Sequence, residues 1–346
     1  MSVGPDEQRR GEPGETAEPG VAGSASGAAG ALGSTDDPAY PPFVRVVVVT
    51  YSPGATLQVF LDSLAAATNR PYEVVLADNG STDGVPQRAA ARPEVTLVPT
   101  GGNLGYGRAA NLGARGALAP WLIVANPDII WRQGSLDTLV DAARRWHRAG
   151  AFGPAILTSE GDLYPSARAL PSLGRGIGHA LAGWWWPANP WTASYRQERG
   201  RPFEGPAGWL SGSCLLVRRT AFEQVGGFDP SYFMYFEDVD LCDRMGRAGW
   251  PSVYVPDAVV EHTGGHATRR APKLMLRAHH LSAYRYLARR YAGPAWAPVR
   301  LVLALGLAGR YIVTRFSRRA AEGAAPTRSA DVLNDGPPSA AGSRSA

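Results

Sequence analysis

The sequence predicts an α/β protein with a Rossmann-like, mostly parallel central sheet and flanking helices. Apolar strand-like runs at 44–50, 72–77 and 121–125 alternate with stretches of helical periodicity, the order expected of a parallel sheet. These runs end at polar or acidic residues, and ligands of such sheets bind beyond the carboxyl ends of the strands. The chain has 346 residues and is 45% hydrophobic, which is enough to bury a substantial core.

The first half of the chain gives the clearer element pattern. The run 44–50 is β-branched and apolar, typical of a buried parallel strand. It is followed by apolar residues at helical spacing, namely Leu57, Phe60, Leu61 and Leu64. Further strands are predicted at 72–77, 95–98 and 121–125, with a loop and helix over 103–118.

The second half is less regular. The segment 170–206, which contains Trp184 to Trp186, is rich in Gly and Pro and is expected to be a long loop or flap. The patterns that follow predict a strand at 208–217, a short helical segment at 222–225, a largely helical stretch over 234–249 and a strand at 252–255.

Composition divides the chain into four parts. Residues 1–40 and 322–346 contain almost no large apolar side chains and are expected to be disordered tails. Between them we expect one folded α/β domain over 41–268 and a basic amphipathic helical extension over 269–321.

The charge and cysteine content suggest a cytoplasmic protein with an anionic partner. The formal net charge is +5, which fits a phosphorylated substrate, a membrane surface or nucleic acid, or else a basic compositional bias. Cys214 and Cys242 form no metal-type pair, so a reducing compartment is expected. We see no signal peptide, and no stretch that reaches transmembrane length, because the apolar run 301–313 is interrupted by Arg310.

Two polar segments could contact a nucleotide. Asp78 ends the second strand and could accept hydrogen bonds from a base or ribose, but Asp-Asn-Gly is equally a turn signal. In the segment 103–107, closely spaced glycines let a backbone approach a ligand, and Arg108 could meet a phosphate. A plain loop explains that second segment as well.

A metal site is suggested by residues that lie far apart in sequence. The apolar strand at 121–125 runs into Asn126-Pro127-Asp128, and Mg²⁺ or Mn²⁺ is commonly held by one or two carboxylates together with phosphate oxygens. His262 could complete such a site. The alternatives are a strand-ending turn and a structural histidine.

The densest acidic cluster is Glu237-Asp238-Val239-Asp240. If it is helical, Glu237 and Asp240 share a face and Asp238 points elsewhere, while Asp240 could pair with Arg244. Buried acids are costly unless they have partners or a task, and a general base for an alcohol is one such task. A helix N-terminus, where the dipole favours acids, is the alternative.

Together and in this order, these segments resemble the family 2 glycosyltransferases of the GT-A fold. The matching stretches are 48–51, 77–84, 102–106, 125–128, 226–229, 236–242 and 261–262. More narrowly, the stretches 164–168, 209–214 and 232–238 look like those of bacterial rhamnosyltransferases that act on polyprenyl-diphosphate-linked N-acetylglucosamine. That resemblance implies dTDP-rhamnose as the donor and a lipid-linked saccharide as the acceptor.

The resemblance also implies residue roles. Thr50, Tyr51 and Asp78 would hold the base and ribose, Asn103 and Arg108 would lie by the nucleotide and diphosphate, and Asn126 and Asp128 would occupy the Asp-X-Asp position. Asp128 and His262 would bind Mg²⁺ or Mn²⁺, and Asp238 would be the base beside Glu237. Asn126 replaces the first acid of the motif, so weaker metal binding is expected. The implied reaction is a single displacement with inversion.

The basic extension predicts a membrane contact. No Asp or Glu lies between Glu261 and Glu322, whereas arginines alternate there with large apolar residues. Basic amphipathic helices lie on anionic bilayers, so peripheral binding to the inner face of the cell membrane is expected. A helical cap on the domain is the alternative. No nucleic-acid motif is seen, a processive synthase would carry transmembrane helices, and a non-catalytic binding protein would be expected to lose its acids.

Overall fold

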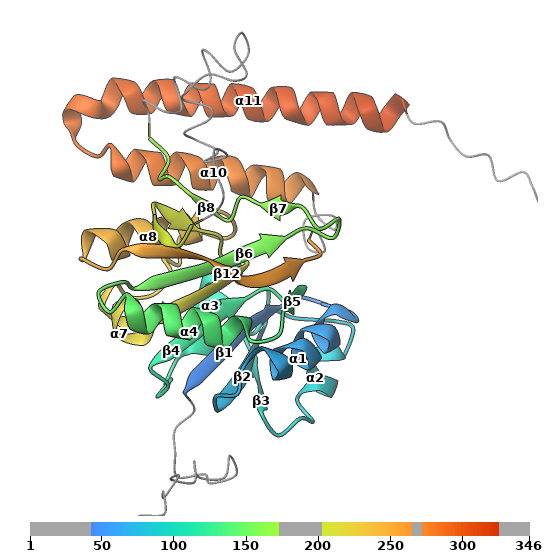
Figure 1. Ribbon diagram of the computed structural model, residues 1–346. Coiled ribbons are helices and arrows are strands. Elements are labelled where there is room, and N and C mark those ends of the chain that lie inside the picture. Colours follow the sequence, from blue (N-terminus) through green and yellow to red (C-terminus); the bar gives the residue numbers. More distant parts are fainter. Residues whose placement is uncertain (1–42, 173–202, 265–271, 325–346) are drawn as a thin grey trace, which may run out of the picture. The chain divides into compact units, whose positions relative to one another are not determined.

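The computed structural model describes residues 43–172, 203–264 and 272–324 (Figure 1). The predicted tail 1–40, the Trp-rich segment 184–191 and most of the predicted tail 322–346 lie outside the described residues.

The parallel half of the sheet forms as predicted. Its strands lie in the order β3-β2-β1-β4 and all pair in parallel, with Thr50 opposite Asp78 and Val48 opposite Ala125. This register brings the carboxyl ends of three strands to one edge of the sheet. The elements of this half are β1 (Val44–Thr50), α1 (Thr56–Ala67), β2 (Tyr72–Asp78), α2 (Val85–Ala89), β3 (Val95–Pro99), α3 (Tyr106–Ala114) and β4 (Trp121–Ala125).

Beyond β4 the sheet becomes mixed. β11 runs antiparallel between β4 and β6, β6 pairs in parallel with β12, and β5 closes that end antiparallel to β12. The next elements are β5 (Ile129–Trp131), α4 (Ser135–Arg145), β6 (Ala151–Leu157), β7 (Leu163–Tyr164), β8 (Ala167–Arg168), β9 (Gly205–Ala207), β10 (Trp209–Leu210) and β11 (Cys214–Arg218). They are followed by α7 (Arg219–Gln224), α8 (Glu237–Arg247) and β12 (Ser252–His262).

One predicted strand is split. The run 208–217 forms β10 and β11, which are separated at 211–213 because the backbone there makes hydrogen bonds outside the sheet. The Asn126 amide donates to the Ser213 carbonyl, and the Gly212 amide donates to the Asp238 carboxylate. β10 pairs with β8 in a separate two-stranded sheet.

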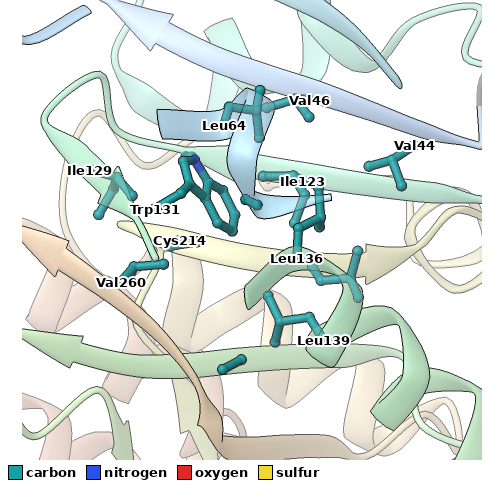
Figure 2. Packing of buried hydrophobic residues seen from close by; sticks show 14 of the residues in the cluster. Val44, Val46, Leu64, Ile123, Ile129, Trp131, Leu136, Leu139, Cys214 and Val260 are labelled. Carbon is teal, nitrogen blue, oxygen red and sulfur yellow. The ribbon is translucent and has the colours of Figure 1, made fainter. Parts of the chain in front are cut away.

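Both faces of β1 are buried, which explains its unbroken apolar run. Val44 and Val46 share one hydrophobic cluster with residues of α1 and α4, among them Leu64 and Leu136 (Figure 2). Val47 faces the other cluster, which draws on α3, α7 and α8. Helices therefore cover the sheet on both sides.

The basic extension forms two helices with different surroundings. α10 (Pro272–Arg290) packs against the domain, because the Ser282 hydroxyl donates to the Met234 carbonyl at 3.0 Å and Tyr286 joins a cluster with Tyr232 and Val239. These contacts are those of the helical cap considered above. α11 (Ala297–Ala324) follows a short 3₁₀ turn, η1 (Pro294–Trp296), and contacts α10 through the Tyr311 and His280 rings.

The helix α11 corrects one expectation from the sequence. Among the helices that the structure describes, one, the 22-residue stretch Pro294–Arg315, is long and apolar enough to cross a membrane by length and composition. A single Arg310 does not end this stretch, because the helix continues through it without a break. None of the most apolar window in this helix is buried.

Candidate active site

A cavity of about 680 Å³ opens at the carboxyl edge of the parallel strands. Its volume falls in the range of small-molecule sites, about 300–1,000 Å³. Seven of the ten predicted site residues line it: Tyr51, Asn103, Asn126, Asp128, Glu237, Asp238 and His262. Thr50, Asp78 and Arg108 are not among its lining residues.

Thr50 and Asp78 are engaged with the protein itself. The Thr50 hydroxyl donates to Asp78 Oδ1 at 2.8 Å, and the same carboxylate accepts hydrogen bonds from the backbone and hydroxyl of Ser81. Both side chains are buried. These contacts fit the alternative given above, in which Asp78 stabilises a turn. A direct contact of either residue with a nucleotide stays a prediction. The neighbouring Asn79 lines the cavity instead.

Arg108 is not among the lining residues of the cavity, and its Nε donates to the Pro230 carbonyl at 2.6 Å. A contact of Arg108 with the diphosphate stays a prediction. Tyr106, two residues earlier and at the start of α3, lines the cavity and donates its hydroxyl hydrogen to the Gly212 carbonyl. No motif in the sequence had identified Tyr106 as a lining residue, because it is otherwise a buried aromatic of a helix.

Asp128 and His262 meet as the metal hypothesis requires. Asp128 lies in the loop after β4, and His262 ends β12, whose pairing with β5 brings it opposite Ile129. His262 Nε2 lies 3.1 Å from Asp128 Oδ1 and 3.2 Å from Asn126 Nδ2. The Asp128 carboxylate is buried but opens onto the cavity.

This spacing fits a divalent ion. Adjacent ligands of an octahedral ion at ~2.1 Å lie ~3.0 Å apart, close to the separation of the Asp128 and His262 atoms. Within the described residues, no group of three or more His, Cys, Asp or Glu side chains gathers around a metal position. Two protein ligands plus phosphate and water is the arrangement that Mg²⁺ commonly takes.

The start of α8 turns two acids into the cavity. Tyr235 and Phe236, which precede the helix, both have left-handed backbones with φ of 66° and 67°. Non-glycine residues rarely adopt this conformation, and it clusters at functional sites. It lets both Glu237 and Asp238 line the cavity, whereas Asp240 pairs with Arg244 at 2.6 Å as its spacing predicts.

Both oxygens of Asp238 accept hydrogen bonds from the backbone, whereas one oxygen of Glu237 has no partner among the described residues. Asp238 Oδ2 accepts from the Gly212 amide and Oδ1 from the Val239 amide, each at 2.8 Å. Glu237 Oε2 is buried without a hydrogen-bond partner in the described part of the chain. A Cβ at Gly212 would lie 3.1 Å from the Asp238 Cβ, so glycine allows this close approach.

The two acids differ in protonation. Burial, reinforced by the neighbouring Asp238 charge, raises the pKa of Glu237 to about 8. Burial also raises the pKa of Asp238, but the Gly212 and Val239 amides and the positive charge of Arg168 oppose that rise. The surroundings therefore favour the charged form of Asp238 more than that of Glu237.

Three side chains from β7 and the two-stranded β8–β10 sheet complete the wall of the cavity. Tyr164, Arg168 and Trp209 line it although none was a predicted site residue. Their stretches had been noted only for their resemblance to rhamnosyltransferases, and no chemistry had been attached to them.

Comparisons with known proteins identify the family of this chain. The model of glycosyl transferase family 2 matches residues 45–226, and that of glycosyl transferase family group 2 matches residues 191–318. The N-acetylglucosaminyl-diphospho-decaprenol L-rhamnosyltransferase of Mycobacterium tuberculosis is 58% identical over 79% of this chain and 94% of its own. The rhamnosyltransferase WbbL of Escherichia coli is 28% identical over 71% of this chain and 93% of its own.

A solved structure supports the fold. The mannosyltransferase of Pyrobaculum calidifontis, in complex with GDP-Man and Mn²⁺, superposes with a TM-score of 0.50 and 22% identity. The match covers 84% of this chain and 78% of that one. The predicted GT-A fold is confirmed.

Proposed function

The chain belongs to glycosyl transferase family 2, and on this premise we propose that it transfers L-rhamnose from dTDP-rhamnose to polyprenyl-diphosphate-linked N-acetylglucosamine. The observation that carries the proposal is the extent of the similarity to the mycobacterial relative, which includes nearly all of that relative's length. The cavity supports it with a carboxylate held by two backbone amides, that of Asp238, and with the adjacent Asp128 and His262 side chains.

The proposed base is Asp238. Its carboxylate takes the proton of an acceptor hydroxyl while that oxygen bonds to the anomeric carbon of the donor sugar. The bond between that carbon and the diphosphate breaks on the opposite face, so the sugar is transferred with inversion. The amides of Gly212 and Val239 fix the orientation of the carboxylate during this step.

The proposed donor site is the other end of the cavity. Asp128 and His262 would hold Mg²⁺ or Mn²⁺, which when bound neutralises charge on the departing diphosphate. Tyr51, Asn103 and Asn126 line the same cavity and are proposed contacts of the nucleotide. Asn126, in place of an acid, leaves one fewer negative charge at the ion.

A donor panel tests the proposal. The protein is incubated with a diphosphate-linked N-acetylglucosamine acceptor and separate dTDP-, UDP- and GDP-sugars, and the anomeric configuration of each product is assigned by NMR. Transfer from dTDP-rhamnose with inversion is expected. Transfer from another donor alone would make the chain a different member of the family, and retention would exclude Asp238 as the base of a single displacement.

We also propose that α10 and α11 bind the anionic inner face of the cell membrane. The faces of α11 differ: Leu303, Leu307 and Tyr311 are half-buried, whereas the exposed apolar residues are Leu301, Val302, Leu305, Ile312 and Val313. Arg300 donates to the carbonyls of Tyr291 and Gly293, just after the end of α10, which fixes the turn between the two helices, and the Tyr311 ring contacts that of His280 in α10. A helix tied along its neighbour in this way is suited to lie in the interface.

Vesicle binding tests this second proposal. Leu305→Gln with Ile312→Gln should reduce co-sedimentation with phosphatidylglycerol vesicles, while phosphatidylcholine vesicles bind less to both proteins. The matched control is Leu118→Gln, since Leu118 is 71% exposed on the catalytic domain, comparable with Leu305 at 64%. Equal binding of the double variant and wild type would exclude the face of α11.

A further inference from the structure

Arg168 is held in the cavity wall between two aromatic rings. Its guanidinium carbon lies 5.5 Å from the centre of the Tyr164 ring and 5.6 Å from that of Trp209. The pairing of β8 with β10 sets Arg168 opposite Trp209, and its Nε donates to the Pro165 carbonyl at 2.8 Å. Such contacts orient a planar guanidinium at a small cost in side-chain freedom.

The two terminal nitrogens of Arg168 have no hydrogen-bond or ion-pair partner among the residues that the structure describes, although the side chain is half-buried and lines the cavity. A guanidinium that is fixed at Nε and open at its fork presents parallel donors to a ligand. Phosphate oxygens are the acceptors that fit this fork.

Charge separates this position from the donor site. Among the described residues that line the cavity, Arg168 is the one Lys or Arg, against the carboxylates of Asp128, Glu237 and Asp238. Arg168 and Asp238 line the same cavity, and the positive charge of Arg168 opposes the rise in the pKa of the Asp238 carboxyl, so Arg168 belongs with the proposed base and its acceptor. A metal at Asp128 and His262 would serve the donor diphosphate and leave the acceptor's own diphosphate without a cation.

We propose that Arg168 binds the diphosphate that links the acceptor sugar to its lipid. This inference rests on the proposed function, since it assigns a residue to the acceptor of that reaction. Tyr164 and Trp209 act as positioning residues that hold the guanidinium in place. The enzyme would thereby recognise the diphosphate of its acceptor as well as the sugar.

Two acceptors that differ only in the linkage test the assignment. One is N-acetylglucosamine on a short prenyl diphosphate, and the other is its octyl glycoside, which has no phosphate. Arg168→Gln should lower kcat/KM about 10- to 100-fold for the first and change it little for the second, as expected for loss of hydrogen bonds to a charged group. Arg168→Lys should fall between.

The control is Arg115→Gln. Arg115 is exposed after α3, and its carbonyl accepts a hydrogen bond from Arg45 near the start of β1, at the opposite edge of the sheet from the cavity. This change removes the same charge from the protein and should leave the preference for the diphosphate acceptor intact. Equal losses for both acceptors in Arg168→Gln would overturn the assignment.

A binding measurement separates acceptor from donor and works without turnover. Geranyl diphosphate is titrated into wild type and Arg168→Gln with dTDP and Mn²⁺ already bound, and dTDP is titrated separately. At least about a tenfold loss for geranyl diphosphate alone is expected. A loss for dTDP alone would assign Arg168 to the donor, and no loss for either would exclude it from both.

These measurements also distinguish failure of the Arg168 assignment from failure of the proposed rhamnosyltransferase function. In the latter case wild type itself transfers rhamnose to neither acceptor. The geranyl diphosphate titration still decides whether Arg168 binds a prenyl diphosphate.

Discussion

Loss of acidity should lower the rate much less at Glu237 than at Asp238. The pKa of Glu237 is about 8, so at pH 7 its side chain is a neutral acid. Glu237→Gln keeps that shape and neutrality and replaces one donor group with another. We expect kcat to fall by less than about tenfold, because the change removes no proton acceptor that works at this pH.

Asp238→Asn should be severe for two reasons. Loss of the base is worth about 10²–10⁴-fold in rate. In addition, both carboxylate oxygens accept backbone amides, from Gly212 and Val239, so an amide NH₂ must face one of these donors. Leaving a buried donor unpaired costs about 1–3 kcal/mol, which should appear as lower stability in urea.

The assay is a single-turnover rate at saturating dTDP-rhamnose, with donor affinity measured by calorimetry and folding by urea titration of each variant. Donor affinity should change little in both variants, because the base acts on the acceptor. A collapsed rate for Glu237→Gln beside a near-normal rate for Asp238→Asn would move the base to Glu237. Equal collapse of both would refute the division of the proton inferred from their surroundings.

Three further predictions concern pH, metal and backbone. Because burial raises the pKa of Glu237 to about 8, the free energy of unfolding should fall between pH 4.5 and about 8 by up to ~1.4 kcal/mol per unit, since the native state keeps the Glu237 proton that the unfolded chain releases; a urea titration series should find this slope reduced in Glu237→Gln, and unchanged slopes would contradict it. Asp128→Ala should abolish the Mn²⁺-dependent gain in dTDP affinity measured by calorimetry, and His262→Ala should reduce it less; an undiminished gain would remove Asp128 from the metal site. Gly105→Ala should destabilise the fold more than Gly101→Ala in urea, because both have φ above +80° but only at Gly105 would the new Cβ lie 2.2 Å from a backbone oxygen, that of Phe233; equal losses would show that backbone strain of about 1–3 kcal/mol is the whole effect.

The parallel half of the fold could be predicted because its signals are local. The strand that ends at Thr50 is recognisable from its own apolar run, and the position of Asp128 follows from the end of the apolar run 121–125. At the end of a strand, a shift of one residue along the chain decides which side chain faces the cavity. Asp78 turns into the protein and Asn79 lines the cavity, a difference that no periodicity encodes.

The wall formed by β8 and β10 could not be predicted. Each of these strands has two residues, too short for an alternating pattern, and their pairing joins Arg168 to a residue far along the chain. Helical spacing likewise suggested that Asp238 points away from Glu237. The left-handed backbone at Phe236 changes the approach to the helix, and both acids line the cavity.

The contacts of α10 set a limit on how far the protein can be shortened. The helix holds the segment before the proposed catalytic acids, because Ser282 donates to the Met234 carbonyl and the His279 ring lies against Tyr235 and Phe236 at 5.5 and 5.8 Å between ring centres. A truncation that improves solubility by removing exposed apolar surface can begin at α11. One that also removes α10 would yield a soluble protein with its catalytic acids unsupported, and its inactivity would be mistaken for a need for lipid.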